Sequence, residues 1–286
     1  MIRKKHRARF AGALVPLFTA AFLLTAEGVS AQDKSALGTT AVRNGIFLIT
    51  GGGCNSLVRL SSNGLIIVDG KLPGNYKALL AKAQRISEQP VRLLINTDYH
   101  DNHTGNNAQF LAAGTQILAQ DNVKQQLAAA QPTKTYDREI NLTLGGIEVQ
   151  VRHFGNARTG GDSVVYFPGQ GVVAVGDIYA AVPDPDFSAG GSLVGWGPVL
   201  GEILKLDFDV VVPGDGPLVG RADLEAFKRK IDDVVSRAIM LVRKGIPKDR
   251  LMAQLAAQPA AGEAGWKLSF TGDRLDRFYD ELMRAR

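Results

Sequence analysis

Cysteine is almost absent from this chain, because Cys54 is the only one. A single thiol cannot form an internal disulfide, and a metal site built from several thiolates is also excluded. Histidine is scarce as well: there are four in 286 residues, and two of them, His100 and His103, stand three positions apart. The stretch 96–105 that holds this pair is therefore the most informative part of the sequence.

Long apolar runs are missing after residue 31, so nothing later in the sequence is expected to cross a bilayer. Residues 1–31 have the layout of a secretory signal peptide: a basic start, an apolar run over 10–26 and a small-residue cleavage site at Ala31. We expect cleavage near Ala31 and a periplasmic or secreted mature chain, 32–286, without membrane contact. The alternative is an uncleaved membrane anchor, for which the run is short.

Excess positive charge is also missing from the predicted mature chain. The whole chain carries +5 and residues 1–31 carry +4, which leaves about +1 for the remainder. A nucleic-acid partner is therefore not expected, since the high pI belongs largely to the export signal. The roughly 255 remaining residues contain no repeat, charge block or linker, and they predict a single domain with one substantial core.

Hydrophobic periodicity predicts short strands interleaved with amphipathic helices. Strands are expected at 45–50, 57–60, 64–68, 91–95, 116–119, 140–144, 147–153, 163–167, 171–175 and 210–212. Helices are expected at 76–86, 107–113, 122–130, 190–206, 224–243, 248–256 and 272–285. Hairpins followed by β/α units, twice over, favour an α+β fold with two mixed sheets between outer helices, a four-layered αββα sandwich.

Three loops at the ends of predicted strands carry polar side chains. They are the stretch 96–105, the pair of segments 157–159 and 176–177, and the stretch 213–217. Ligands and catalytic groups gather in loops that a rigid scaffold holds. The candidate site residues in these loops are Asp98, His100, Asn102, His103, Arg158, Asp177 and Asp215.

These motifs resemble those of the metallo-β-lactamase superfamily of hydrolases, over nearly the whole predicted mature chain. In that family the first loop reads Asn-Thr-His-x-His-x-Asp-His-Thr-Gly, the second has a His before Thr together with a Gly-Asp pair, and the third reads Pro-Gly-His-Gly-Pro. Asp69, after the strand at 64–68, matches the family's early structural aspartate. The resemblance implies an αββα fold and hydrolysis of an ester, lactone or amide, β-lactams included.

The family's two zinc sites carry over only in part. The resemblance places Asp98, His100 and Arg158 at the first metal, and Asn102, His103, Asp177 and Asp215 at the second. Arg158 cannot ligate a cation, because its guanidinium stays charged and only donates hydrogen bonds. We therefore expect Arg158 to replace the first ion and to pair with Asp98 or Asp177.

The second site keeps His103, Asp177 and Asp215 as ligands for at most one divalent cation. Carboxylate-rich ligation shifts the preference from zinc toward manganese or magnesium. Asn102 stands where the family has the aspartate that orients the attacking water, and an amide cannot accept a proton at neutral pH. Asp98 is then the candidate base, with His100 positioning water or substrate.

Two functional hypotheses remain open. The first is an exported hydrolase with at most one divalent metal, and the second is a catalytically inactive, metal-free relative that binds a small molecule in the same cleft. The second would follow if Asp98, Arg158 and Asp215 form an ion-pair network in an emptied metal cavity, since buried charges need partners in either case. A small molecule is the expected partner in both.

The other residues near these loops have simpler interpretations. His153 and Cys54 are expected to be structural, and Asp101 to face solvent. Aromatic residues that follow Asp177 either line the mouth of a pocket or belong to the core; they are Tyr179, Phe187 and Trp196.

Overall fold

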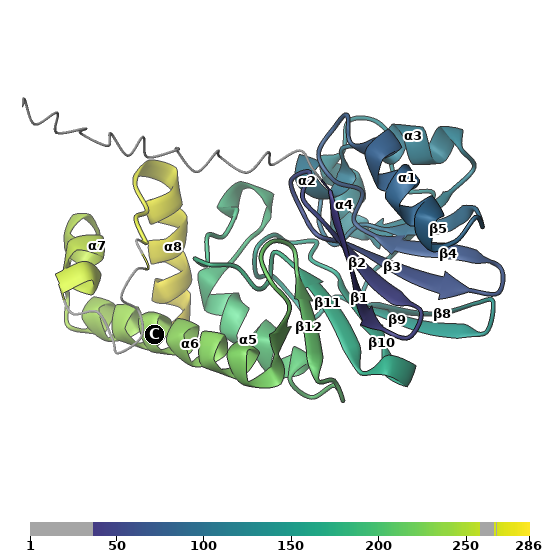
Figure 1. The fold of residues 1–286 in the computed structure, drawn as a ribbon. Helices are drawn as coiled ribbons and strands as arrows, with labels where there is room; N and C mark the ends of the chain where they lie inside the picture. Colours follow the sequence, from purple (N-terminus) through teal and green to yellow (C-terminus); the bar gives the residue numbers. More distant parts are fainter. Residues whose placement is uncertain (1–36, 258–265, 267) are drawn as a thin grey trace, which may run out of the picture. The chain divides into compact units, whose positions relative to one another are not determined.

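The computed structural model describes residues 37–257, 266 and 268–286, which belong to one compact unit (Figure 1). The signal peptide expected at 1–31 lies outside the described residues, so its cleavage and the export of the chain stay predictions. Among the described residues, none of the helices has the length and apolar character that a membrane span requires.

One sheet has seven strands in chain order: β1 (Gly38–Arg43), β2 (Ile46–Thr50), β3 (Ser56–Ser61), β4 (Gly64–Val68), β5 (Val91–Ile95), β6 (Gln116–Gln120) and β7 (Lys134–Tyr136). β1 to β4 pair antiparallel, whereas β4 to β7 pair parallel. Val68 is opposite Ile95 in this register, and the backbone N–H of Asp69 donates to the carbonyl of Ile95. The loops after β4 and β5 therefore leave the same edge of the sheet together.

The second sheet has six strands in the order β13 (Val219–Gly220), β12 (Val210–Pro213), β11 (Val172–Gly176), β10 (Val164–Phe167), β9 (Ile147–Arg152) and β8 (Glu139–Leu144). β11 and β12 are parallel, and Gly176 is opposite Pro213. Asp177 and the Gly214–Asp215 turn therefore follow neighbouring strand ends, and the backbone N–H of Gly214 donates to the carbonyl of Gly176.

Helices cover the outer faces of the two sheets. They are α1 (Tyr76–Ile86), α2 (Asp101–Thr104), α3 (Asn107–Ala112), α4 (Asp121–Gln126), α5 (Leu193–Ile203), α6 (Arg221–Arg243), α7 (Lys248–Ala257) and α8 (Gly272–Ala285), with 3₁₀ turns η1 (Pro168–Gln170) and η2 (Phe187–Ala189). Figure 1 shows α1 and α3 together over the seven-stranded sheet, and α5, α6 and α8 grouped beside the other sheet.

Three buried clusters account for this layering. One contains inward residues of both sheets, such as Ile66 and Val165, and joins the two sheets. The second joins the outer face of the seven-stranded sheet to α1 and α3 through residues such as Leu79. The third joins the six-stranded sheet to α5, α6, α7 and α8 through residues such as Trp196. The predicted αββα sandwich is confirmed.

Some elements differ from the sequence-based expectation. β1, β7, β13 and the one-turn helix α2 were not predicted, and α4 ends at Gln126 because Leu127 adopts an extended backbone. The helix expected at 190–206 begins at Leu193, where the Ser192 hydroxyl accepts a hydrogen bond from the backbone N–H of Gly195 and caps it. Cys54 is buried, as expected for a packing residue.

A buried lysine holds the turn between β2 and β3. The Lys71 ammonium donates to the carbonyls of Ile49, Gly51 and Cys54 at 2.9, 2.8 and 2.6 Å, and the side chain is fully buried. Backbone groups in a turn have no strand partner, so burying them requires donors of this kind. Lys71 therefore fixes the 51–54 turn relative to the loop after β4.

Replacing Lys71 by methionine should strip all three carbonyls of their donor at little change in volume. We expect the free energy of unfolding to fall by about 3 kcal/mol, because each buried acceptor left without a donor is costly. Urea unfolding measures this, with Lys77→Met on the exposed face of α1 as the matched control, expected to change stability by less than about 0.5 kcal/mol. Equal stabilities of the two variants would contradict the role assigned to Lys71.

Candidate metal centre and active-site cleft

The loop after β5 places His103 at the centre of the site. His100 precedes the first turn of α2, and its carbonyl accepts from the backbone N–H groups of His103 and Thr104. The carbonyl of His103 in turn accepts from the backbone N–H of Gly70 at 2.7 Å and from the Asn96 amide at 3.0 Å. The loop is thus tied to the ends of both β4 and β5, and His103 is completely buried.

The ring of His103 is oriented by Asp69. Its Nδ1 lies 2.9 Å from Oδ2 of Asp69, whose two oxygens also accept from the backbone N–H and the hydroxyl of Thr97, both at 2.8 Å. A carboxylate at this distance assigns the proton to Nδ1. The lone pair of Nε2 then faces the interior, where the Asn102 amide nitrogen lies 2.8 Å from it, and carboxylates commonly orient metal-ligating histidines in this way.

Asp98, His103 and Asp177 form a cluster that can hold a metal ion. One ligand atom from each lies within 4.8 Å of the others. Nε2 of His103 is 3.3 Å from Oδ1 of Asp177 and 3.7 Å from Oδ2 of Asp98. Among the described residues, Oδ2 of Asp98 has no hydrogen-bond donor although it is buried. A buried acceptor in this state is costly, and a cation between the three groups would satisfy it, so the residues fit a divalent ion.

Electrostatics also indicate a shortage of positive charge here. Burial, and to a lesser extent the negative charge of Asp98, raises the pKa of Asp162 to about 7. Hydrogen bonds from Thr159 act in the opposite direction but are outweighed. Burial opposes protonation of His103, but the charges of Asp98 and Asp69 outweigh it and raise the pKa of His103 well above its usual value. Without a metal ion, a proton on His103 would supply part of the missing charge.

His100 does not belong to this cluster, but it contacts the cluster residue Asp98. Its Nδ1 is 3.1 Å from Oδ1 of Asp98, its Nε2 is 3.4 Å from Oδ2 of Asp186, and its ring stacks on Tyr99 with centroids 4.3 Å apart. The hydroxyl of Tyr99 donates to the same carboxylate of Asp186. Burial lowers the pKa of His100, but the hydrogen bond and charge of Asp98 outweigh it and leave the pKa raised. Both ring nitrogens of His100 thus face carboxylates.

Arg158 pairs with Asp177, one of the two partners expected from the sequence. Its Nε lies 3.9 Å from Oδ2 of Asp177, and the guanidinium also donates to the carbonyl of Asp184. Asn102 is next to the cluster on the other side, with its amide nitrogen 2.8 Å from Nε2 of His103. Both side chains line an open cleft of about 480 Å³.

Asp215 lies at the mouth of this cleft. It is exposed, and it lines the cleft together with Asp177 and Arg158, but it does not belong to the three-residue cluster. In the structure the carboxylate grouped with His103 and Asp177 is that of Asp98, and the ligand role expected for Asp215 stays a prediction. The sequence-based prediction made Asp98 a candidate base at a position of the first metal. A carboxylate is also a common metal ligand, so the residue type of Asp98 was a signal for this second role.

Comparison with known proteins identifies the family. The model of the metallo-beta-lactamase superfamily matches residues 49–215, which is more than half of the chain. The chain belongs to the metallo-beta-lactamase superfamily. The match runs from the end of β2 through β12 and includes all seven candidate site residues.

Solved structures agree with this assignment in their fold. The metallo-beta-lactamase from Pontibacter korlensis is 19% identical with a TM-score of 0.62, covering 69% of this chain and 99% of that one. Metallo-beta-lactamase FIM-1 from Pseudomonas aeruginosa, in its mono-zinc form, is 19% identical with a TM-score of 0.60, covering 69% and 95%. Both show the shared metallo-beta-lactamase fold.

A curated relative has a different description. It is the 2,4-dinitroanisole O-demethylase subunit alpha of Nocardioides sp. (strain JS1661). It is 27% identical over 231 residues, which cover 76% of this chain and 69% of the relative.

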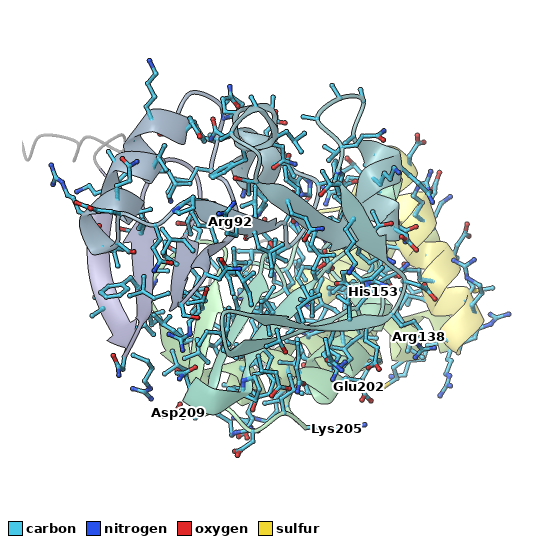
Figure 2. All side chains as sticks on the ribbon, turned by 90° about the vertical axis from the view of Figure 1, so that its right-hand side faces the viewer. Arg92, Arg138, His153, Glu202, Lys205 and Asp209 are labelled. Carbon is cyan, nitrogen blue, oxygen red and sulfur yellow. The ribbon has the colours of Figure 1, made fainter. Side chains whose placement is uncertain are left out.

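The remaining candidates are placed by the metallo-beta-lactamase scaffold. Trp196 and Phe187 are core residues, with the Trp196 indole donating to the carbonyl of Ile178 at 2.8 Å, whereas Tyr179 lines the cleft. Asp101 is exposed, as expected. His153 contacts the carbonyl of Asp162 through Nδ1 at 2.8 Å and lines a separate cavity of about 650 Å³ with Arg138 and Glu202. Figure 2 labels these three side chains.

Three residues that contribute to the site were not found from the sequence: Tyr99, Asp162 and Asp186. Asp162 accepts from the backbone N–H of Thr159 at 3.0 Å and from its hydroxyl at 2.6 Å, which shapes the loop that carries Arg158. The Asp186 carboxylate also accepts hydrogen bonds from the backbone N–H groups of Ser188 and Ala189. No motif marks these residues, because each acts through the contacts of its own loop.

The metal-free protein should lose stability as the pH rises from 5 to 8. Folded Asp162 keeps its proton to about pH 7, whereas the unfolded chain releases it near 3.8, so its contribution is lost as the pH rises through this window. His103 has the same sign, because its raised pKa lets the folded state hold a proton that the unfolded chain releases near 6.5. Urea unfolding at constant ionic strength, after chelation of metals, measures the slope.

Asp162→Asn should flatten the lower half of that slope, and the exposed Asp101→Asn should leave it unchanged. The lowered pKa of Asp98 does not affect this slope, because it changes stability only at pH values below the usual pKa of a carboxyl group. A stability that rises between pH 5 and 8 in the metal-free protein would show that the cluster is not short of positive charge.

Proposed function

We propose that this protein is a metal-dependent hydrolase whose single divalent cation, zinc, manganese or magnesium, is held by Asp98, His103 and Asp177. The observation that carries the proposal is the arrangement around His103. Asp69 orients the ring, Nε2 faces two carboxylates, and Oδ2 of Asp98 has no donor among the described residues. Bound there, the cation would supply Lewis acidity and an activated water molecule.

A second metal ion is not part of the proposal. Arg158 places a permanent positive charge 3.9 Å from Asp177, and guanidinium cannot ligate a cation. Both ring nitrogens of His100 face the carboxylates of Asp98 and Asp186. Arg158 instead lines the cleft as a fixed donor, suited to hydrogen-bond a carbonyl oxygen and the negative charge that develops on it during hydrolysis.

Asp98 is the residue proposed to handle the proton. Its Oδ1 accepts from the backbone N–H of His100 at 2.8 Å, so only Oδ2 faces the cluster. Burial raises the pKa of Asp98, but the charge of His103 and the hydrogen bond from His100 outweigh it and keep the carboxyl ionised. This oxygen can ligate the cation, as proposed above, and it is also ionised and therefore able to accept a proton from water, whereas the Asn102 amide cannot accept a proton at neutral pH.

The substrate class follows from the superfamily and from the cleft. Superfamily membership favours hydrolysis of an ester, lactone or amide, β-lactams included, and the cleft volume of about 480 Å³ suits a small molecule. The relative that is described as an O-demethylase subunit adds aryl methyl ethers to the substrates worth testing. Export to the periplasm, proposed from residues 1–31, would give such an enzyme access to extracellular compounds.

A metal-free binding protein is the second candidate. It is favoured by one observation, which is that the raised pKa of His103 and the guanidinium of Arg158 already provide positive charge beside Asp98 and Asp177. In that case the same cleft would bind a small molecule without turning it over.

Metal analysis of the purified protein separates the two candidates. We expect one equivalent of metal by mass spectrometry, lost in His103→Asn and Asp177→Asn and kept in Asp215→Asn, because Asp215 lies outside the cluster. Below the pKa of His103, affinity should rise about tenfold per pH unit, since the cation displaces one proton. Hydrolysis of nitrocefin, p-nitrophenyl esters or 2,4-dinitroanisole should be lost in the same variants.

Absence of metal under every loading condition, together with no turnover, would overturn the hydrolase proposal and leave the binding protein. Loss of metal in Asp215→Asn with retention in Asp98→Asn would instead restore Asp215 as the third ligand.

Restoring the superfamily's ligand types should restore a second metal ion. The fourfold variant Asp98→His, Asn102→Asp, Arg158→His and Asp215→His is expected to bind two equivalents of zinc. The threefold variant that keeps Arg158 should bind one, because the guanidinium still opposes the first ion. If the two variants bind the same number of zinc ions, Arg158 is not the residue that excludes the second ion.

A further inference from the structure

Leu72 is an exposed leucine on a fixed backbone. Its side chain is 41% exposed, and only Met240 shares this degree of exposure among the large hydrophobic residues that the structure describes. The backbone N–H of Leu72 donates to the carbonyl of Gly52 at 3.0 Å, and its carbonyl accepts from the amides of Asn75 and Asn106, both at 2.9 Å. Its exposure is therefore not the result of a loosely held loop.

The segment that carries Leu72 is seated directly on the metal loop. Gly105, at the end of α2, leaves room for the ring of Pro73, since a Cβ there would lie 2.3 Å from Cδ of Pro73. Gly53 leaves room for Leu72 in the same way, since a Cβ would lie 2.4 Å from its Cγ. Gly53 lines the active-site cleft, so Leu72 lies at the border of the cleft.

A second hollow begins at this border. It measures about 690 Å³ and has an apolar wall made of Leu72, Pro73, Leu127, Ala128 and Ala129. Asn102 lines both this hollow and the active-site cleft, and its amide is 2.8 Å from Nε2 of His103. The two hollows thus share Asn102 as a wall residue, next to the residue that would hold the cation.

The two hollows differ in charge. The active-site cleft contains Arg158, Asp177, Asp184 and Asp215, all able to bind polar groups. The second hollow, which we call the apolar arm, has Asp101 and His100 as its only ionisable groups besides Tyr99, and Leu72 and Leu127 belong to its wall. Both hollows also have apolar lining, with Val182 and Val219 in the cleft, so a molecule that spans both would meet most of the charged groups at the cleft end.

We propose that the substrate is an asymmetric ester, lactone or amide whose apolar substituent lies in the apolar arm, while its polar part points toward Arg158. The proposal rests on the hydrolase function proposed above and names its substrate class. Leu72 and Leu127 are then specificity-determining residues, because removing apolar surface from water favours binding in proportion to the area buried. The scissile bond would lie at the junction near Asn102.

A series of esters with one leaving group tests this directly. With p-nitrophenyl acetate, butyrate, hexanoate and octanoate, only the length of the apolar chain changes. For the metal-loaded protein we expect kcat/KM to rise roughly twofold per methylene, as for partial burial of each group. The ratio of octanoate to acetate should drop at least fivefold in Leu72→Ser and in Leu127→Ser, and it should be retained in Leu72→Met.

Met240→Ser is the matched control, because Met240 is equally exposed but lies on α6 outside both hollows. It should keep the wild-type ratio. Ester hydrolysis without chain-length preference, or with the same preference in both serine variants, would overturn the apolar arm and leave the hydrolase function intact.

A protein that hydrolyses no ester would refute the hydrolase function, and the apolar arm is then tested by binding. Calorimetry with butanamide, hexanamide and octanamide should show affinity that rises with chain length in the wild type and not in Leu72→Ser. Binding that does not depend on chain length, or no binding of any of the three amides, would overturn the arm as well.

Discussion

The contact between Asp69 and His103 is the interaction on which the rest of the site depends. Asp69 follows β4 and His103 follows β5, and the parallel register of these strands brings the two loops to one edge of the sheet. Once Asp69 holds Nδ1, Nε2 must face inward toward Asp177, which comes from the other sheet. The packing of the two sheets thereby sets the distances between the groups that could hold a cation.

Charge balance is the second constraint, and it explains why the divergent residues are compatible with one another. Asp98 and Asp177 are close to His103, and burial makes their charges costly unless a positive charge is near. A divalent ion, a proton on His103 and the guanidinium of Arg158 can each supply that charge. Arg158 is permanent, whereas the ion and the proton compete for Nε2 of His103. A guanidinium at position 158 therefore gives Asp177 a positive partner that does not depend on a bound ion.

The helices and strands that depend on a local residue pattern could be predicted from the sequence. The strand at 91–95 and the helices at 76–86 and 272–285 were predicted with their observed bounds, because strong periodicity is bounded by turn residues. β7 and β13 were not predicted, since a strand of two or three residues is too short to show a hydrophobic periodicity. The loops of the site were found through motif spacing, but the contact of Tyr99 with Asp186 joins residues 87 positions apart, and only the folded chain reveals it. The same holds for the convergence of Asp98, rather than Asp215, on His103.

The segment 69–73 combines three requirements of the cleft within five residues. Asp69 orients His103, Lys71 fixes the 51–54 turn, and Leu72 borders the apolar arm. Asp69 and Lys71 have φ values of 67° and 69°, a left-handed conformation that non-glycine residues rarely adopt and that costs of order 1 kcal/mol each. Hydrogen bonds from the backbone N–H groups of Asp69 and Leu72 hold the segment in this shape. Because one strained segment sets the orientation of His103 and the position of Leu72 together, the proposed metal binding and the proposed substrate preference would be coupled through its backbone.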